Sequence, residues 1–272
     1  MSPPTTPPCA TSTPVSPGAD VAVCLVYPDL LGTYGDGGNT RILAQRLRWR
    51  GIAAEVVTVR LGDRLPAGCD LYVLGGGEDR PQALAAAELR RDGALAAAAA
   101  AGSVVLAVCA GVQVVGTRFL TADGITAGVG LVDLETVRGL PARAVGELAV
   151  DPDPSLGLPR LSGYENHAGA TCLGPGVSPL GTVARGVGNG TGGGDGFIAG
   201  RMLGTYLHGP VLARNPEVAD LLLSWVVGTL PPLEQTEADA EARGLRAERL
   251  AATGPGGGGR TRAWWRGYQR GT

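Results

Sequence analysis

The sequence predicts an α/β fold with a mostly parallel central sheet flanked by helices, and three observations support this prediction. Short apolar segments alternate with helical patterns through the first half of the chain. Glycine-bearing loops follow several of these apolar segments. The 272 residues are also enough for one large domain with a substantial core. Such alternation is typical of parallel strands joined by helices that cover both faces of a sheet.

The elements of the first half can be assigned in chain order. Residues 21–26 form a short apolar strand, and Asn39 or Thr40 caps a helix that reaches Arg50 and stops at Gly51. The next elements are strands at residues 53–59 and 71–74, an alanine-rich helix from Arg80-Pro81 to about Ala101, and an apolar strand at residues 102–108. Ligands of parallel sheets bind at the carboxyl ends of the strands. The loops that we expect at these ends are residues 27–39, 75–77 and 109–111.

The second half has a different character. Residues 129–206 are richer in β-type residues and glycine, which predicts added antiparallel strands at one edge of the sheet. Asn215-Pro216-Glu217 combines an N-cap, a proline and an acid, so a helix begins there and packs on the sheet. Thr236 and Asp239 predict a capping box for a charged helix that reaches about Ala251.

Composition divides the chain into three parts. Residues 1–19 are rich in proline, serine and threonine and lack the features of a signal peptide, so we expect a disordered tail. Residues 20–230 hold the α/β domain, and residues 231–272 form a helical and flexible extension with a glycine linker at 254–259. The last stretch, residues 260–272, mixes arginine with tryptophan and tyrosine. We expect a disordered end there, with contact to an anionic membrane surface as the alternative.

Charge and cysteine usage exclude several classes of protein. The formal net charge of −2 gives no basic field for nucleic acid, so we expect no nucleic-acid partner. The five cysteines are scattered, and with only two histidines no metal-ligand spacing occurs, so we expect neither a disulfide framework nor a metal site. The longest uncharged run, residues 94–117, is interrupted by Gly102-Ser103 and Gly111. We therefore expect a cytoplasmic protein.

Cys109 is the strongest candidate for a nucleophile. It follows the apolar strand at 102–108 and precedes Ala110-Gly111 and a helical pattern. This arrangement presents a side chain on a sharp turn from strand to helix. The start of the helix would also stabilise the thiolate, which is the reactive form. The alternative interpretation is a buried cysteine that ends a core strand.

A thiol nucleophile needs a base, and only His167 and His208 are available. His208 follows the apolar segment 202–207 and precedes Gly209-Pro210, so it lies at a strand end, where active-site residues collect. His167 lies in a polar loop and could be structural. The pattern therefore favours a pair formed by Cys109 and His208.

A tetrahedral intermediate at Cys109 requires hydrogen-bond donors for its oxyanion. The backbone N–H of Ala110 is one candidate. The loop Gly75-Gly76-Gly77 supplies the other, which we assign to Gly76, because residues without side chains let the backbone approach closely. A plain glycine turn is the alternative.

Together these features resemble the class I glutamine amidotransferases. The matching residues are the glycine loop, Cys109-Ala110-Gly111-Val112-Gln113 and the late histidine. Further motifs resemble the cobyric-acid-synthase-like subgroup and, within it, the glutaminase subunits of lipid II isoglutaminyl synthases. These motifs are Tyr27-Pro28-Asp29-Leu30, Tyr34-Gly35-Asp36-Gly37-Gly38-Asn39, Gly75-Gly76-Gly77-Glu78-Asp79-Arg80, Tyr164-Glu165-Asn166-His167-Ala168-Gly169, and Gly204-Thr205-Tyr206-Leu207-His208-Gly209-Pro210 followed by Asn215-Pro216.

The resemblance implies a flavodoxin-like fold and hydrolysis of L-glutamine through a γ-glutamyl thioester on Cys109. It also implies a heterodimer, in which a Mur-ligase-like partner subunit binds ATP, Mg²⁺ and lipid II. Ammonia from this chain would convert the α-carboxylate of D-glutamate in lipid II to D-isoglutamine, a step of peptidoglycan biosynthesis. This chain itself would carry no cofactor. It contains no GxxxxGK[ST] loop for ATP, as expected if the partner binds the nucleotide.

The resemblance further implies that Arg143 binds the substrate. A guanidinium can hold the α-carboxylate of glutamine with two hydrogen bonds, whereas the alternative is a solvated arginine on an edge strand. Gln113 could line the glutamine pocket or pack within its helix.

Two positions depart from the family pattern. Ala107 stands where most members have glycine, and Pro210 stands where most have an acid that orients the histidine. Either a Cys–His dyad suffices, or an acid comes from elsewhere, with Glu165 and a carboxylate of the partner subunit as candidates. Two alternative functions remain open: a glutaminase for the amidation of cobalamin precursors, and a non-catalytic regulatory protein with a redox-sensitive cysteine at the turn.

Overall fold

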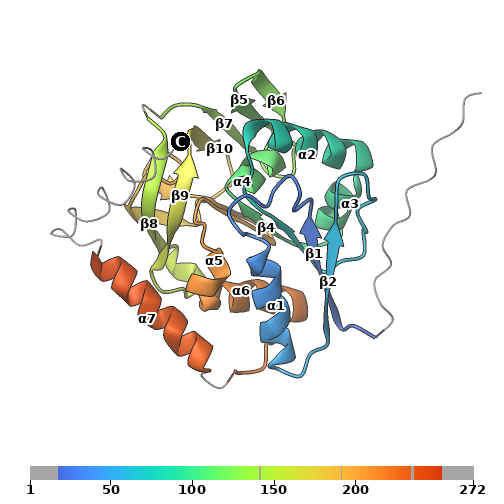
Figure 1. The fold of residues 1–272 in the computed structure, drawn as a ribbon, viewed down its shortest axis with the longest axis vertical. Helices are drawn as coiled ribbons and strands as arrows, with labels where there is room; N and C mark the ends of the chain where they lie inside the picture. Colours follow the sequence, from blue (N-terminus) through green and yellow to red (C-terminus); the bar gives the residue numbers. More distant parts are fainter. Residues whose placement is uncertain (1–17, 141, 191, 234–235, 253–272) are drawn as a thin grey trace, which may run out of the picture.

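The computed structural model describes residues 18–140, 142–190, 192–233 and 236–252. Its centre is a six-stranded sheet with the strand order β13-β14-β4-β3-β1-β2 (Figure 1). The strands are β1 (Val21–Val26), β2 (Ala54–Val59), β3 (Leu71–Leu74), β4 (Val104–Val108), β13 (Phe197–Ala199) and β14 (Met202–Thr205). All neighbours in this sheet are parallel except β13, which runs antiparallel to β14.

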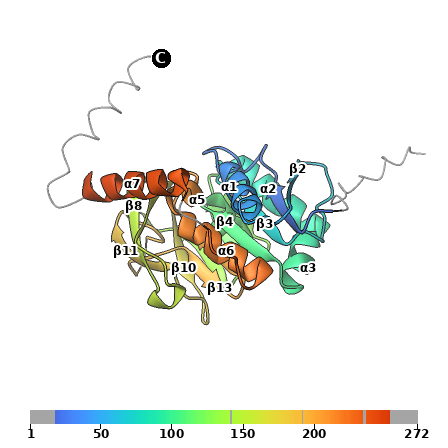
Figure 2. The ribbon, with the colours of Figure 1, turned by 90° about the horizontal axis from the view of Figure 1, so that it is seen from below.

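Helices cover both faces of this sheet, as the alternating pattern predicts. The helices α1 (Gly38–Arg48) and α6 (Pro216–Val227) lie on one side, and α2 (Asp79–Asp92), α3 (Ala94–Ala100) and α4 (Ala110–Val115) lie on the other (Figures 1 and 2). Every residue of β4 is buried, which is typical of a parallel strand covered on both faces.

Two helix predictions need correction. The alanine-rich helix expected up to about Ala101 is divided into α2 and α3 by Gly93, whose φ of 73° ends α2 in a left-handed cap. Neither Asn39 nor Thr40 caps α1, which begins at Gly38. The Asn39 side chain instead accepts a hydrogen bond from the N–H of Leu212 at 3.1 Å. This bond ties α1 to α5 (Val211–Arg214).

The second half of the chain builds two smaller sheets instead of simply widening the central one. One has the order β10-β7-β5-β6 and the other the order β12-β11-β8-β9. Their strands are β5 (Arg118–Thr121), β6 (Gly124–Ala127), β7 (Leu134–Arg138), β8 (Ala144–Pro152), β9 (Leu161–His167), β10 (Gly169–Leu173), β11 (Gly181–Arg185) and β12 (Gly194–Asp195). A short 3-10 turn, η1, covers Pro154–Leu156. The strand pairs are antiparallel except β5 with β7, and only β13 extends the edge of the central sheet.

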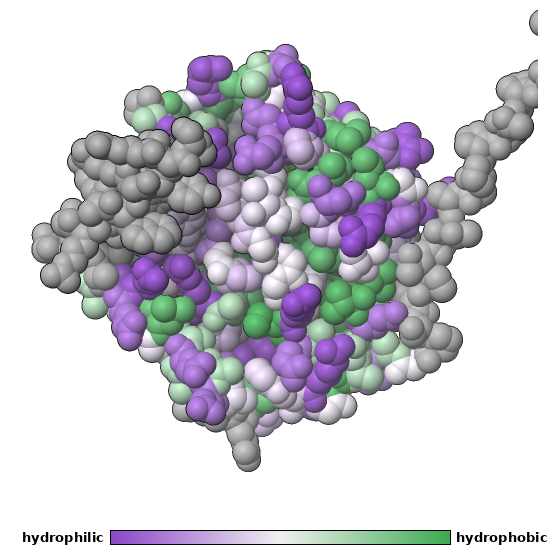
Figure 3. Space-filling view, in the orientation of Figure 1, coloured by the Kyte–Doolittle hydropathy of each residue, from purple (hydrophilic) through white to green (hydrophobic). Residues whose placement is uncertain are grey.

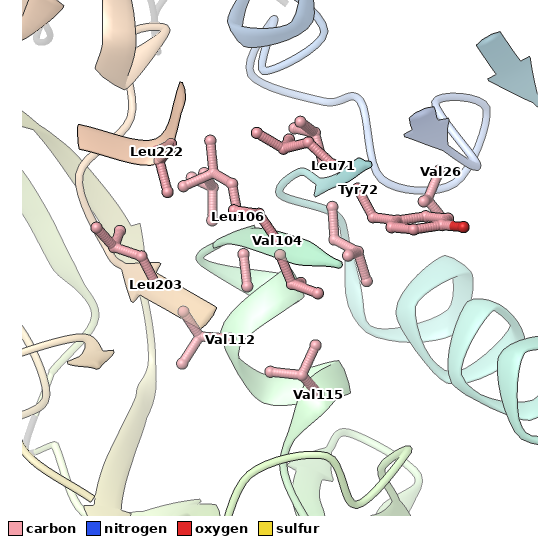
Figure 4. Close-up of a cluster of buried hydrophobic side chains, with 14 of the residues drawn as sticks. Val26, Leu71, Tyr72, Val104, Leu106, Val112, Val115, Leu203 and Leu222 are labelled. Atoms are coloured by element: carbon pink, nitrogen blue, oxygen red, sulfur yellow. The ribbon is translucent and has the colours of Figure 1, made fainter. Parts of the chain in front are cut away.

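The core lies between the central sheet and its helices. Figure 4 shows side chains of β1, β3, β4, β14, α4 and α6 in this cluster; the labelled residues are Val26, Leu71, Tyr72, Val104, Leu106, Val112, Val115, Leu203 and Leu222. On the outer face drawn in Figure 3, hydrophilic and hydrophobic residues are interspersed, as on an ordinary folded domain. None of the helices in the described ranges combines the length and apolar character needed to cross a bilayer.

The C-terminal extension includes α7 (Glu237–Ala252), which packs on the domain. One of the two bonds of the predicted capping box is present, from the N–H of Asp239 to Oγ1 of Thr236 at 3.1 Å, whereas the Asp239 carboxylate binds Arg46. The buried Arg46 of α1 joins α7 to α6, through Asp239 at 2.5 Å and Asp220 at 2.6 Å. The tail predicted before residue 18 and the linker and arginine-rich end predicted after residue 252 lie outside the described residues.

Candidate active site

Cys109 lies on the sharp turn that joins β4 to α4, as the sequence predicts. Its φ of 51° and ψ of −102° fall in a strained region for a residue with a side chain. The turn is tied to both neighbouring strands. The N–H of Cys109 donates to the carbonyl of Thr205, the last residue of β14, at 2.9 Å, and the N–H of Gly111 donates to the carbonyl of Gly75 after β3 at 3.1 Å. A Cβ on Gly111 would lie 2.7 Å from the carbonyl oxygen of Leu74, so only glycine fits there.

His208 follows β14, the parallel neighbour of β4, and therefore lies at the same edge of the sheet as Cys109. The imidazole is 2 % exposed. Its Nδ1 lies 3.2 Å and 3.4 Å from the two carboxylate oxygens of Asp36. Its Nε2 is buried and has no hydrogen-bond partner among the described residues, so this nitrogen is available for proton transfer.

The electrostatics of the site favour a charged imidazole. Burial lowers the pKa of His208, but the negative charges of Cys109 and Asp36 together raise it to about 10. Cys109 is the largest of the raising causes, so its side chain lies within electrostatic range of the imidazole. The arrangement therefore favours the imidazolium form of His208 near neutral pH.

Asp36 is the functional residue that the sequence reasoning missed. It lies in the loop between β1 and α1, is fully buried, and accepts a hydrogen bond from the N–H of Gly76 at 2.8 Å. The acid that orients His208 thus comes from the first loop of the domain instead of from position 210. The only signal in the sequence is the motif of residues 34–39, which contains Asp36 but does not by itself show what this carboxylate contacts.

Glu165, proposed as a source of this acid, serves a different histidine. Its carboxylate accepts from the N–H groups of Val187 and Gly188, each at 2.9 Å, and lies 3.3 Å from Nε2 of His167. The ring of His167 stacks on Tyr206, with centroids 4.1 Å apart. The prediction that Glu165 orients His208 is therefore wrong, because its hydrogen-bonding capacity is used in this second buried cluster.

A cavity of about 320 Å³ opens beside Cys109. Its volume is in the range of small-molecule sites, roughly 300–1,000 Å³. Arg143, the residue directly before β8, lines this cavity together with Cys109. Its Nε donates a hydrogen bond to Oδ1 of Asn166 at 2.6 Å. The structure thus brings the expected carboxylate-binding residue into the same cavity as the nucleophile; its binding role stays a prediction.

Gln113 also lines the cavity, which favours the first of the two interpretations of this residue. Its Oε1 accepts a hydrogen bond from Nε2 of Gln82 at 2.7 Å, and its Nε2 lies 3.4 Å from the hydroxyl of Tyr206. These two contacts hold the Gln113 side chain at the cavity wall, one helical turn beyond Cys109.

One of the two oxyanion donors needs correction. Ala110 lines the cavity, but the N–H of Gly76 already donates to Asp36 and is not free for an oxyanion. Gly77 lines the cavity instead, and the N–H groups of Ala110 and Gly77 have no backbone acceptor within the described part of the chain. Gly76 is needed for another reason: a Cβ there would lie 2.6 Å from Cε1 of His208.

No group of three or more histidine, cysteine or acidic side chains within the described residues is arranged to hold a metal ion. The site instead has the parts of a thiol hydrolase: a strained cysteine, a buried histidine and a carboxylate. These parts are attached to the ends of neighbouring parallel strands, next to a cavity.

Comparison with known proteins gives the same picture. The chain is 36 % identical over 219 residues to the lipid II isoglutaminyl synthase (glutamine-hydrolyzing) subunit GatD of Staphylococcus aureus, covering 79 % of this chain and 88 % of the relative. It is 32 % identical to the corresponding subunit of Streptococcus pneumoniae, covering 73 % and 77 %. Similarity to the cobyric acid synthase of Xanthobacter autotrophicus, 32 % identical, covers 58 % of this chain but only 33 % of that protein.

Solved structures confirm the fold. One described as a glutamine amidotransferase matches with a TM-score of 0.51 and 20 % identity, covering 77 % of this chain and all of that one. A chain of PurLQS from Thermotoga maritima matches with a TM-score of 0.52 and 17 % identity, covering 76 % and 97 %. Residues 22–216 match the CobB/CobQ-like glutamine amidotransferase domain, and the chain therefore belongs to this family.

Proposed function

We propose that this chain is the glutaminase subunit of a lipid II isoglutaminyl synthase. It hydrolyses L-glutamine and passes the ammonia to a synthetase subunit that amidates the D-glutamate α-carboxylate of lipid II. The observation that carries the proposal is the buried array of Cys109, His208 and Asp36 beside a cavity lined by Arg143. Similarity to two subunits of such synthases over most of their length supports the choice of pathway.

The geometry accounts for each chemical step. The Cys109 thiolate attacks the side-chain carbonyl carbon of glutamine and forms a tetrahedral intermediate. The His208 imidazolium gives its Nε2 proton to the amide nitrogen, the C–N bond breaks, and ammonia leaves the γ-glutamyl thioester. His208 then takes a proton from water, which attacks the thioester carbonyl. Collapse of this second intermediate expels the thiolate and releases glutamate, with the imidazolium restored.

Three further parts of the site support these steps. The N–H groups of Ala110 and Gly77 stabilise the oxyanion, since both residues line the cavity and neither N–H has a backbone acceptor. The guanidinium of Arg143 holds the α-carboxylate of glutamine at the same cavity. The carboxylate of Asp36 keeps the His208 proton on Nδ1 and directs Nε2 to the nucleophile.

The partner subunit in this proposal is a Mur-ligase-like synthetase that binds ATP, Mg²⁺ and lipid II. This chain contributes glutamine hydrolysis and requires no cofactor for it. The heterodimer works in the cytoplasm, close to the inner face of the membrane where lipid II is exposed.

The alternative of cobalamin-precursor amidation receives less support. The chain spans about a third of the cobyric acid synthases that it matches, whereas it spans most of the isoglutaminyl synthase subunits. A purely regulatory cysteine is also less well supported, because such a protein has no need of a buried carboxylate aligned with the Nδ1 atom of His208.

The decisive experiment compares Cys109→Ala with wild type in complex with the synthetase subunit. Glutamine-dependent amidation of lipid II is expected to vanish, while ammonium salts still support it, because the synthetase site is untouched. Cys172→Ala is the matched control, since this half-buried cysteine lies on β10 away from the cavity lining. Retained glutamine-dependent activity in Cys109→Ala would show that another group is the nucleophile.

A further inference from the structure

We propose that Tyr34 and Asn166 are positioning residues that connect the carboxylate-binding Arg143 to the base His208. The inference rests on the proposed function, because that function places the α-carboxylate of glutamine on Arg143 and proton transfer on His208. It adds a physical link between the two, so that the loop that contacts the base also holds Arg143 ready for the substrate.

The first contact of this link is between Tyr34 and His208. Their ring centroids are 4.5 Å apart with an interplanar angle of 46°. Tyr34 lies two residues before Asp36, so the loop between β1 and α1 contacts the imidazole twice: the carboxylate at Nδ1 and the phenol ring against the ring face. Gly76 packs closely against Cε1 of His208 and covers a third side of the imidazole. The imidazole is thereby restricted in rotation while Nε2 stays free.

The second contact is between Tyr34 and Asn166. Nδ2 of Asn166 donates to the Tyr34 hydroxyl at 2.8 Å, and Oδ1 of Asn166 accepts from Nε of Arg143 at 2.6 Å. The orientation of this amide is fixed by chemistry, since a guanidinium can only donate and therefore requires the oxygen of Asn166 on its side. Burial raises the pKa of Tyr34, so its hydroxyl stays neutral and can accept this bond.

The link joins two parts of the molecule. Asn166 lies on β9 of the small sheet, paired with Val145 of β8, and Arg143 directly precedes β8. Tyr34 belongs to a loop of the central sheet. The bond between Asn166 and Tyr34 therefore bridges the sheet that holds the substrate carboxylate and the loop that holds the base.

Arg143 can still bind a carboxylate while its Nε is hydrogen-bonded to Asn166. Its Nε is used at 2.6 Å, and its Nη2 lies only at the limit of bonding, 3.5 Å from the Asn166 carbonyl. The Nη groups can thus receive a carboxylate from the cavity that Arg143 lines. The phenol that packs on the imidazole holds Asn166, and Asn166 in turn holds the guanidinium in the position that receives the carboxylate. The loop that contacts the catalytic base thereby preorganises the carboxylate-binding residue, which strengthens substrate binding.

The test separates the ring of Tyr34 from its hydroxyl by steady-state glutaminase kinetics of the complex with its synthetase subunit. Tyr34→Phe keeps the ring but loses the bond to Asn166, so KM for glutamine is expected to rise about fivefold with kcat within about twofold of wild type. Tyr34→Leu also loses the ring contact, and kcat is expected to fall about tenfold further. Phenylalanine at position 34 thus rescues kcat but not KM.

Asn166→Ala breaks both hydrogen bonds and is expected to raise KM at least as much as Tyr34→Phe. Because both changes cut the same link, the double variant is expected to have about the KM of Asn166→Ala alone. Tyr164→Phe is the matched control: it removes a hydroxyl two residues away on the same strand, and no hydrogen bond of this hydroxyl occurs within the described residues.

The inference is overturned if Tyr34→Phe leaves KM within twofold of wild type, or if the double variant shows the product of the two single effects. Thermal unfolding checks that each variant is folded. Should Asn166→Ala fail to fold, the comparison of Tyr34→Phe with Tyr34→Leu decides alone. If the wild-type complex releases no glutamate from glutamine, the proposed function is refuted and the inference with it. If the wild type is active and the variants behave like it, only the link is refuted.

Discussion

Replacing Asp36 by asparagine tests the most consequential contact of the site. Asparagine has the size of aspartate, so its Oδ1 can still accept the N–H of Gly76, which lies 2.8 Å from the carboxylate. The amide nitrogen then takes the place of the other carboxylate oxygen, which lies 3.4 Å from Nδ1 of His208 in the native site. An amide N–H there requires Nδ1 to act as acceptor, which puts the imidazole proton on Nε2. In this tautomer Nε2 cannot take the thiol proton from Cys109.

The expected loss follows from two effects. A hydrogen bond to a charged group contributes ~1.5–3 kcal/mol, which is about 10- to 150-fold in rate. The wrong tautomer adds to this loss, and in serine proteases the equivalent change lowers kcat about 10⁴-fold. We therefore expect Asp36→Asn to lower kcat for glutamine hydrolysis between about 100-fold and 10⁴-fold.

The pH profile provides an independent measure of the same contact. Burial lowers the pKa of His208, and Cys109 and Asp36 raise it to about 10. The imidazolium is the acid for the leaving ammonia, so activity is expected to fall as the pH rises through about 10. Removing the Asp36 charge removes one raising cause, and the alkaline limb of the profile moves to lower pH.

The assay is release of glutamate from glutamine by the complex, measured across the pH range for both proteins. Asp29→Asn is the control, because Asp29 lies in the same loop and, among the residues that the structure describes, accepts from the N–H of Leu61 alone, at 3.1 Å and 3.4 Å. A kcat within about fivefold of wild type for Asp36→Asn, with an unmoved alkaline limb, would refute the role of this carboxylate.

Three further predictions concern other parts of the molecule. Gly76→Ala places a methyl group 2.6 Å from Cε1 of His208 and is expected to lower kcat at least about 100-fold in steady-state kinetics. Gly68→Ala is the control and is expected to leave kcat unchanged, because the added Cβ has no non-adjacent atom of the described residues within 4 Å. Arg46→Ala removes the buried arginine that Asp220 and Asp239 share. It is expected to lower the free energy of unfolding by about 3 kcal/mol in urea titrations. A loss below about 1 kcal/mol would mean that α7 is held by other contacts. Burial raises the pKa of Asp195 to about 6, above its unfolded value, so the folded protein binds the proton more tightly and the free energy of unfolding falls as the pH rises from about 4 to 6. Urea titrations at both ends of this range are expected to show a smaller fall for Asp195→Asn, and an equal fall would assign the effect to another group.

The sequence predicts those parts of the site that depend on local pattern. Cys109 and His208 each follow an apolar strand, and because parallel strands end at one edge, their proximity could be inferred without coordinates. The glycine loop was found for the same reason. What the pattern lacks is the direction of each side chain and N–H group. It could not show that the Asp36 side chain points to the imidazole. Nor could it show that this carboxylate accepts the N–H of Gly76, so that the N–H of Gly77 is the one left for an oxyanion.

The fold shows the same division between local and long-range information. The five parallel strands of the central sheet were predicted within a few residues, because each is a short apolar run between turns, whereas β13 was not assigned individually. The division of the strands after residue 117 into two small sheets was not predicted, since it depends on pairings between distant segments, such as β5 with β7 and β10 with β7. The break at Gly93 was missed because a glycine inside an alanine-rich helix is tolerated unless its backbone turns left-handed.

The position of the acid has a consequence beyond the orientation of one histidine. In a triad whose acid follows the histidine on its own strand, the carboxylate can be lost without disturbing the oxyanion loop. Here Oδ2 of Asp36 contacts both Nδ1 of His208 and the N–H of Gly76, the residue before the proposed donor Gly77. The same carboxylate therefore fixes the base and the backbone that stabilises the intermediate. For this reason the loss for Asp36→Ala, which breaks both contacts, should exceed the loss for Asp36→Asn, which keeps the one to Gly76; equal losses would show that the oxyanion loop holds its shape unaided.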